Sequence, residues 1–141
     1  MARGDEKINH LGQMWLFSTC SRRDLQRIAR VCDEIEVPAG KVIMEEGAPG
    51  KEFFLILDGT AVVRRKNRKV ATVGPGQYVG ELALLTRMPR DSTVLADSDM
   101  RLLVLGQREF SAVLDDVPGL SHKLLEAMAT RLRDADTKVS A

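Results

Sequence analysis

The sequence is poor in the residues that support catalysis, metal binding or covalent cross-linking. It contains two cysteines, two histidines, one tryptophan and one tyrosine in 141 residues. Cys20 and Cys32 do not stand at metal-ligand spacing, and His10 and His122 are solitary, so we expect reduced thiols and no metal centre. Because no nucleophile with a base and no acid–base pair can be assembled, the sequence predicts that the chain is not an enzyme.

Long apolar runs and an excess of charge of either sign are also absent. No stretch approaches the roughly 20 apolar residues of a membrane span, and residues 1–7 are polar, without the apolar core of a signal peptide. The 21 basic and 20 acidic residues give a net charge of +1. These absences predict a cytoplasmic protein with no membrane span and no nucleic-acid contact.

What the chain does contain fits one domain, because 44% of its residues are hydrophobic and 29% are charged. Residues 1–32 predict N-terminal helices. Residues 33–105 form short apolar runs punctuated by glycine and proline, which is typical of an antiparallel barrel or jelly roll. Residues 106–136 return to helical spacing and predict two C-terminal helices. The predicted fold class is therefore mainly β, a jelly-roll barrel with an N-terminal helical arm and two C-terminal helices.

Local signals set the expected boundaries of several elements. Ser21 followed by Asp24 resembles a capping box and predicts a helix over 21–32. Pro118 is expected to separate the two C-terminal helices. The predicted strands are Ile35–Val37, Lys41–Met44, Phe53–Leu57, Ala61–Arg65, Val70–Val73, Thr93–Ala96 and Arg101–Leu105.

Residues 80–92 carry the pattern most suggestive of chemistry. An apolar turn of helix follows Glu81, and a helix N-terminus exposes N–H groups, so the amides of Leu82 and Ala83 are able to hold an anionic oxygen. Arg90 adds a planar fork of donors to the same anion. A carboxylate such as Glu81 suits this place if it accepts a hydrogen bond from a ligand hydroxyl, as a ribose 2′-OH beside a cyclic phosphate would provide.

The run Gly-Glu-Leu-Ala-Leu-Leu, then Pro-Arg, then Ser-Thr-Val resembles the phosphate-binding cassette of the cyclic-nucleotide-binding domain family. Residues 37–40, 54–59 and 74–76 are also similar to that family, so the resemblance covers nearly the whole chain. It implies a regulatory module that senses cAMP, with cGMP left open, and whose C-terminal helix moves over the base. The ligand-binding residues that it implies are Gly80, Glu81, Leu82, Ala83, Arg90, Asp91, Ser92 and Arg131.

The resemblance also implies a role for each of these residues. Glu81 would receive the ribose 2′-OH, while Arg90 and the cassette amides would hold the phosphate. Gly80 would permit the turn, and Ser92 would add a hydroxyl contact. By its position, Arg131 or one of its neighbours, Thr130 and Leu132, would cap the base.

Asp91 departs from the family pattern, which usually has Ala, Ser or Thr after the arginine. A carboxylate there opposes an anion unless it points outward or pairs with Arg87 or Arg90. The alternative interpretation is a ligand-free barrel in which Glu81 and Arg90 form a structural ion pair. Such a barrel would act as a protein–protein interaction scaffold.

Residues 64–69 read Arg-Arg-Lys-Asn-Arg-Lys and are expected at a hairpin tip. Such a run serves either as a solvated edge with protective charge or as a contact for nucleic acid or another acidic surface, and we favour the solvated edge. The expected partners are a cyclic nucleotide and an effector protein or domain. A homodimer through the last helix stays open.

Overall fold

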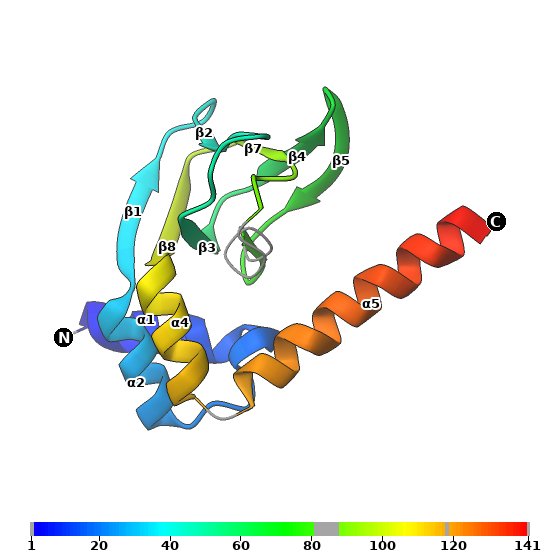
Figure 1. The fold of residues 1–141 in the computed structure, drawn as a ribbon. Coiled ribbons are helices and arrows are strands. Elements are labelled where there is room, and N and C mark those ends of the chain that lie inside the picture. The colour runs from blue at the N-terminus through cyan, green and yellow to red at the C-terminus, as the bar shows by residue number, and fades with distance from the viewer. Residues whose placement is uncertain (1, 81–87, 118, 141) are drawn as a thin grey trace.

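The computed structural model describes residues 2–80, 88–117 and 119–140. Helices open and close the chain, and strands fill its middle (Figure 1). The helical elements are α1 (Ala2–Gln13), the 3₁₀ helix η1 (Trp15–Phe17), α2 (Arg22–Val31), α4 (Gln107–Asp116) and α5 (Leu120–Ser140). The strands are β1 (Asp33–Val37), β2 (Val42–Met44), β3 (Glu52–Asp58), β4 (Ala61–Arg65), β5 (Arg68–Val73), β6 (Tyr78–Val79), β7 (Thr93–Ala96) and β8 (Met100–Gly106).

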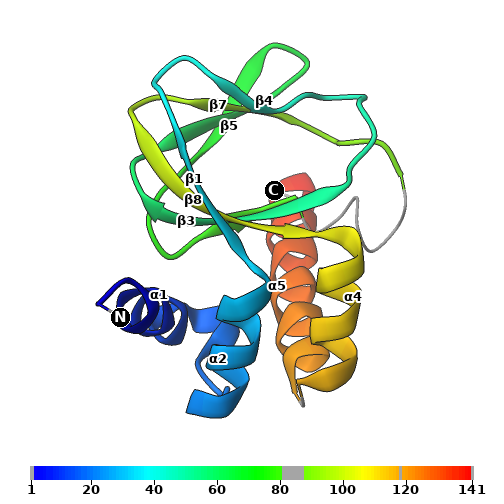
Figure 2. The ribbon, with the colours of Figure 1, turned by 90° about the vertical axis from the view of Figure 1, so that its left-hand side faces the viewer.

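The strands form two four-stranded antiparallel sheets with the orders β1-β8-β3-β6 and β2-β7-β4-β5. Figure 2 shows the sheets facing each other, with the helices below the sheet that contains β3 and β8. The described strands form two facing antiparallel sheets, as the predicted jelly roll requires, but do not close into a barrel, because within the described residues no strand pairing joins an edge of one sheet to an edge of the other.

Strand β3 is a continuous apolar run because both of its faces are covered. Successive side chains of a strand point to opposite faces. Phe53, Leu55 and Leu57 pack toward the helices, whereas Phe54 and Ile56 pack between the two sheets. The same alternation in β8 makes these two central strands a wall that two cores share.

The predicted capping box at Ser21 is confirmed. The Ser21 hydroxyl accepts a hydrogen bond from the Asp24 N–H at 3.1 Å, and the Asp24 carboxylate accepts one from the Ser21 N–H at 3.2 Å. These bonds satisfy two N–H groups that a helix start would otherwise leave unpaired. Helix α2 accordingly begins at Arg22.

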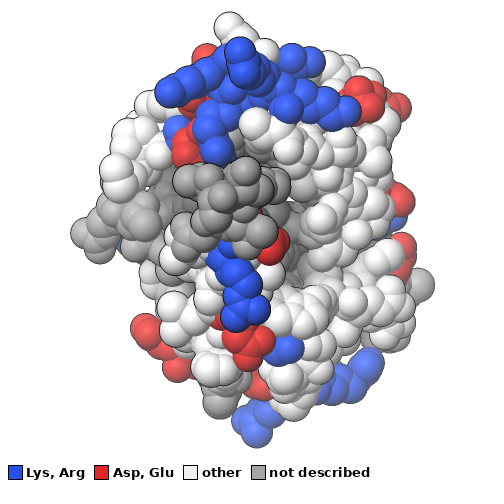
Figure 3. Space-filling model, turned by 90° about the vertical axis from the view of Figure 1, so that its right-hand side faces the viewer, with Lys and Arg blue, Asp and Glu red and all other residues white. Residues whose placement is uncertain are grey.

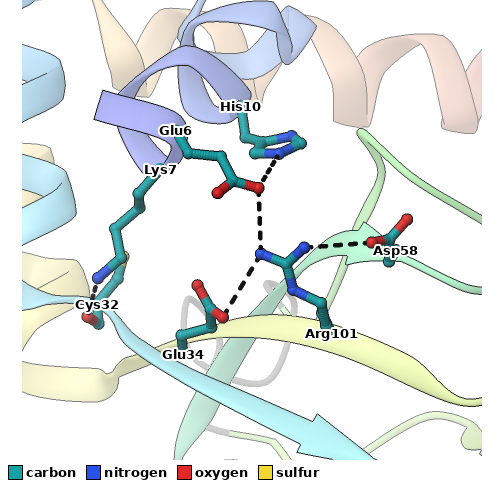
Figure 4. A network of polar contacts seen from close by, with 7 residues as sticks. All are labelled: Glu6, Lys7, His10, Cys32, Glu34, Asp58 and Arg101. Atoms are coloured by element: carbon teal, nitrogen blue, oxygen red, sulfur yellow. Dashed lines mark hydrogen bonds and ion pairs between the residues drawn. The ribbon is translucent and has the colours of Figure 1, made fainter. Parts of the chain in front are cut away.

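Helix α1 is held against the sheet by polar contacts around Arg101 of β8 (Figure 4). The Arg101 guanidinium lies 3.6 Å from Glu6 of α1, 3.5 Å from Glu34 of β1 and 3.3 Å from Asp58 of β3. Lys7 donates to the carbonyl oxygens of Ala29 and Cys32 at the end of α2. Because these groups are partly exposed, each pair contributes only about 0–1 kcal/mol, and together they fix where α1 lies.

Helix α5 is anchored through its first turns. Leu120 and Leu124 are buried in the core with η1, while Leu125 and Leu132 are 64% and 66% exposed. The Lys123 ammonium lies 4.2 Å from the centroid of the Trp15 ring, a cation–π contact that reinforces the anchor. Beyond it, α5 runs away from the sheets (Figure 1). Within the described residues, no helix is both long enough and apolar enough to cross a membrane.

The boundary between the two C-terminal helices lies where the sequence places it, since α4 ends at Asp116 and α5 begins at Leu120. Pro118 itself lies outside the described residues. The strands Ala61–Arg65 and Thr93–Ala96 have the predicted bounds, and the sequence did not predict β6.

Candidate functional site

A pocket of about 260 Å³ opens between the sheet of β4, β5 and β7 and the segment that contains Arg90. Its volume lies just below the roughly 300–1,000 Å³ common for small-molecule sites. The wall is mostly apolar, with a few polar groups. The described lining residues are Met44, Val63, Arg65, Val70, Ala71, Val73, Tyr78, Val79, Gly80, Arg90, Asp91, Ser92 and Val94.

A larger hollow of about 830 Å³ lies among α1, α2 and β1, far in the sequence from Arg90. Its lining residues are Lys7, Ile8, Gln26, Ala29, Arg30, Glu34 and Glu36. The lining is polar or charged except for Ile8 and Ala29, and none of the described lining residues is buried. Ligand sites combine an apolar wall with a small number of fixed polar groups. The smaller pocket meets that description, and the larger one does not.

Arg90 is the buried cation of the pocket, with 7% of its surface exposed. Its Nη1 donates to the carbonyl oxygen of Gly80 at 3.1 Å, and its Nη2 donates to the carbonyl oxygen of Glu52 at 2.8 Å. The guanidinium carbon also lies 6.0 Å from the centroid of the Phe54 ring. These contacts fix the plane of the guanidinium at the pocket wall.

The backbone of Arg90 is fixed as firmly as its side chain. Its N–H donates to the carbonyl oxygen of Ala48 at 2.8 Å, and its carbonyl oxygen accepts from the N–H of Gly47 at the same distance. The segment before β7 is thereby tied to the loop after β2. Arg90 thus reaches the pocket from a backbone that is held on both sides.

Gly80 occupies a position that a side chain would disturb. Its φ is +97°, in the left-handed region that glycine adopts without steric cost. A Cβ added there would lie 2.8 Å from Arg90 Nη1 and 2.8 Å from the Glu52 carbonyl oxygen. The glycine therefore permits both the turn after β6 and the close approach of the arginine.

Asp91 pairs with Arg65, a residue that was not among the partners expected from the sequence. Its Oδ2 lies 3.2 Å from Arg65 Nη2, and Arg65 Nε donates to the Asp91 carbonyl oxygen at 3.2 Å. Arg65 is the last residue of β4, 26 positions earlier in the chain. From the sequence, Arg65 was expected at the end of a strand and in the basic run 64–69, so its contact with the pocket was missed.

Ser92 is buried, with 6% of its surface exposed, and its hydroxyl donates to Asp91 Oδ1 at 3.2 Å. The structure therefore brings Gly80, Arg90, Asp91 and Ser92 together around one pocket. Glu81, Leu82 and Ala83 lie outside the described residues, as does Arg87.

Arg131 belongs to α5, but its side chain lies outside the part of the chain that the structure describes. Its neighbour Thr130 donates its hydroxyl to the carbonyl oxygen of Glu126 in the same helix, and Leu132 is exposed. No described residue of α5 lines the pocket. Of the predicted capping residues, Thr130 and Leu132 are described, and neither lines the pocket.

The apolar wall of the pocket was also missed by sequence reasoning. Val63 of β4, with Ala71 and Val73 of β5, lines the pocket through side chains that project from the facing sheet. The signal that could have identified this wall is the pairing of β4 with β5, since pairing decides which residues of the two strands share a face.

Comparison with known proteins shows which family this chain resembles. The sequence profile described as the cyclic nucleotide-binding domain matches residues 34–116. A cAMP-dependent protein kinase regulatory subunit from Aspergillus fumigatus is 35% identical over 115 residues, which make up 80% of this chain and 28% of the relative. The cyclic AMP receptor protein of Thermus thermophilus is 32% identical over 107 residues, or 72% of this chain and 50% of the relative.

Solved structures agree with the sequence comparison. The crystal structure of the Thermus thermophilus catabolite activator protein matches with a TM-score of 0.84 at 28% identity, covering 89% of this chain and 61% of that chain. The chain spans between about a quarter and a half of the length of the curated relatives described here. Because the profile covers more than half of its residues, the chain belongs to the cyclic nucleotide-binding domain family.

Proposed function

We propose that this domain is a regulatory module that binds cAMP in the pocket around Arg90. The observation that carries the proposal is the buried guanidinium, whose plane is fixed by two backbone carbonyl groups at the wall of an otherwise apolar pocket. A guanidinium oriented in this way suits the two free oxygens of a cyclic phosphate, because its donors form a planar fork. The domain itself would make and break no covalent bond.

The other cassette residues complete the proposed site. The amides of Leu82 and Ala83 would share the phosphate with Arg90, and the Glu81 carboxylate would accept the ribose 2′-OH. Ser92 would add a hydroxyl near the phosphate. The apolar wall on β4 and β5 would cover part of the ligand, which suits a base that must be removed from water.

The Asp91–Arg65 pair supports ligand binding over the scaffold alternative. The chief objection to an anionic ligand is the carboxylate at Asp91. Its ion pair with Arg65 supplies a nearby positive charge, and the Ser92 hydroxyl also donates to it. Opposite charges at this distance offset each other's field on a neighbouring anion.

Calorimetric titration with cAMP and with cGMP tests the proposal. Saturable heat with cAMP in the wild-type protein supports it, and Arg90→Ala is expected to weaken binding by about a hundredfold, since it removes a charged hydrogen-bond donor. Arg90→Lys retains the charge without the fork and is expected to bind at an intermediate affinity. Arg108→Ala, which removes an exposed arginine on α4, is the matched control.

Circular dichroism of each variant separates lost binding from lost folding, because Arg90→Ala leaves two carbonyl groups without their donor. No heat from the wild-type protein with either nucleotide would favour the ligand-free scaffold. Tighter binding of cGMP than of cAMP would overturn the base preference and leave the nucleotide site in place.

We also propose that α5 responds to the nucleotide. In this structure α5 is anchored by Leu120 and Leu124 and contributes no described residue to the pocket, so capping a bound base would require its later turns to move. Moving its later turns over the base would let Arg131 or a neighbour cap it, and the result would be a population shift between two helix positions. Amide hydrogen exchange in residues 120–134 should change at saturating cAMP; unchanged exchange with proven binding would contradict this motion alone.

The exposed leucines of α5 also favour pairing of this helix with an effector protein or a second copy of the chain. Leu125 and Leu132 of α5 are 64% and 66% exposed. Sedimentation of the purified domain with and without cAMP tests the homodimer. A monomer over the whole concentration range would leave an effector protein as the partner.

A further inference from the structure

The hairpin of β4 and β5 concentrates positive charge on a nearly neutral protein. Five of the six residues 64–69 are arginine or lysine, whereas the whole chain carries a net charge of +1. All six are exposed. Figure 3 shows Lys and Arg side chains gathered at one end of the face that it presents. We call residues 64–69 the basic hairpin.

The register of the basic hairpin places like charges directly opposite each other. Arg64 pairs across the strands with Lys69, and Arg65 pairs with Arg68. Like charges opposite one another in an antiparallel pair are destabilising. Folding alone therefore does not favour this arrangement, and another role must offset its cost.

Protection of a sheet edge accounts for only part of the charge. Strand β5 is an edge strand, and charges such as Arg68 and Lys69 discourage pairing with another sheet. Strand β4 lies inside the sheet, between β5 and β7, and has no edge to protect. The charge of Arg64 on β4 is not explained in this way.

The basic hairpin already binds carboxylates of its own chain. Arg65 holds Asp91, and the backbone N–H of Lys66 donates to Glu46 Oε1 at 3.0 Å. The side chains of Arg64, Lys66, Arg68 and Lys69 have no carboxylate at ion-pair distance within the described residues. Four cations are thus open to carboxylates from outside the chain.

We propose that the basic hairpin is a docking surface for an acidic segment of a partner protein, rich in Asp and Glu. Carboxylates are the groups that the hairpin is seen to hold, and arginine forks match them in geometry. The hairpin has no aromatic side chain on which a base would stack and no apolar side chain at its tip to enter a bilayer. Arg65 also lines the nucleotide pocket, whereas Arg64, Arg68 and Lys69 do not.

Binding of a fluorescent hexaglutamate peptide, followed by anisotropy at low and at physiological salt, tests the proposal. The wild-type protein should bind the peptide, more weakly as salt rises. The variant R64Q/R68Q/K69Q should lose about tenfold or more in affinity, because each exposed ion pair adds a small and roughly additive share. The variant R23Q/K51Q/R108Q removes the same charge from exposed sites elsewhere and should bind as the wild type does.

Thermal unfolding of the same variants separates docking from a structural role. Removing opposed like charges should leave the melting temperature of R64Q/R68Q/K69Q unchanged or raise it by a few degrees. A fall of several degrees would mean that these cations stabilise the fold, and it would overturn the proposal.

Three binding results would also overturn it. The first is no peptide binding by the wild-type protein at low salt, and the second is an equal loss in both triple variants. The third is tighter binding, at equal salt, of phosphatidylserine vesicles or of a DNA duplex than of the peptide, which would assign the basic hairpin to a phosphate surface instead.

Discussion

The two cores of this domain share the strands β3 and β8 but differ in what they enclose. The core on the helical side is filled by leucines and by Phe53, which packs against Phe110 at 4.9 Å and Tyr78 at 5.4 Å between ring centroids. The core between the sheets borders the pocket, where Arg90 and Ser92 are buried as polar groups.

The two faces of the shared strands β3 and β8 therefore serve different purposes. Dense apolar packing on the helical side provides stability. The inter-sheet side encloses space and buried polar groups, which stabilise a fold less but can recognise a ligand. Substitutions on the helical side should therefore affect folding, whereas those at the pocket should affect binding more than stability.

The largest expected effect is the protection of Cys32, on the helical side. Burial, opposed by Lys7 and aided by Asp33, raises the pKa of its thiol to about 12. At pH 8 the thiolate population should thus be about a thousandfold lower than in the unfolded chain. Alkylation by iodoacetamide, followed by mass spectrometry, should modify the less buried Cys20 first, although burial raises the pKa of that thiol as well.

The same shift sets a dependence of stability on pH. Because the folded thiol of Cys32 holds its proton more tightly than the unfolded one, its contribution is complete below about pH 9 and is lost as the pH rises toward about 12. Urea unfolding at increasing pH measures this loss. In the alkylation experiment, equal rates for both cysteines in the folded protein would contradict the protection expected for Cys32.

Leu124→Ala and Leu125→Ala compare a buried with an exposed leucine one position apart. Leu124 is 3% exposed and lies in the helical core, so its truncation should cost about 2–5 kcal/mol of unfolding free energy. Leu125 is 64% exposed, and its truncation should change the free energy by less than about 0.5 kcal/mol. Urea denaturation measures both, and equal losses would show that α5 packs differently.

Gly80→Ala tests the pocket side, with Gly76→Ala as its matched control. Both glycines have a positive φ, so each substitution carries a strain of about 1–2 kcal/mol. Only at Gly80 does the new methyl group also meet Arg90 and a backbone carbonyl oxygen, whereas nothing lies within 4 Å at Gly76. Gly80→Ala should therefore weaken cAMP binding and Gly76→Ala should not, as calorimetry would show; equal affinities would refute the close approach.

Arg65→Gln should have only a small effect on stability. Its pair with Asp91 is about half exposed, so the loss should be about 0–1 kcal/mol and should shrink with added salt. Thermal unfolding at two salt concentrations measures it. A loss well above this range that ignores salt would mean that the pair belongs to the core.

Periodicity and local signals predicted most of the fold. The capping box at Ser21, the strands Ala61–Arg65 and Thr93–Ala96, and the helix pair at the C-terminus all depend on residues close in sequence. Strand β6 has only two residues, too few to show an alternation, and was missed. Closure of the sheets depends on which distant strands pair, so local patterns predicted the strands but not their division into two separate sheets.

For the site, too, local signals were visible in the sequence and contacts between distant segments were not. Arg90 was predicted as a ligand-binding residue because its residue type and its place in a known cassette are visible in the sequence, and it is buried at the pocket. The groups that hold it are the carbonyl oxygens of Gly80 and Glu52, which every residue carries and no side-chain pattern reveals. The Arg65–Asp91 pair required the pairing of β4 with β7, which brings the end of one strand to the start of the other.

Trp15 gives this domain a built-in optical probe. It is the sole tryptophan of the sequence, is half exposed, and has the Lys123 ammonium of α5 over its ring. Indole emission depends on nearby charge and on contact with water. The intrinsic fluorescence of the unlabelled protein should therefore report whether the first turns of α5 stay anchored while the pocket fills.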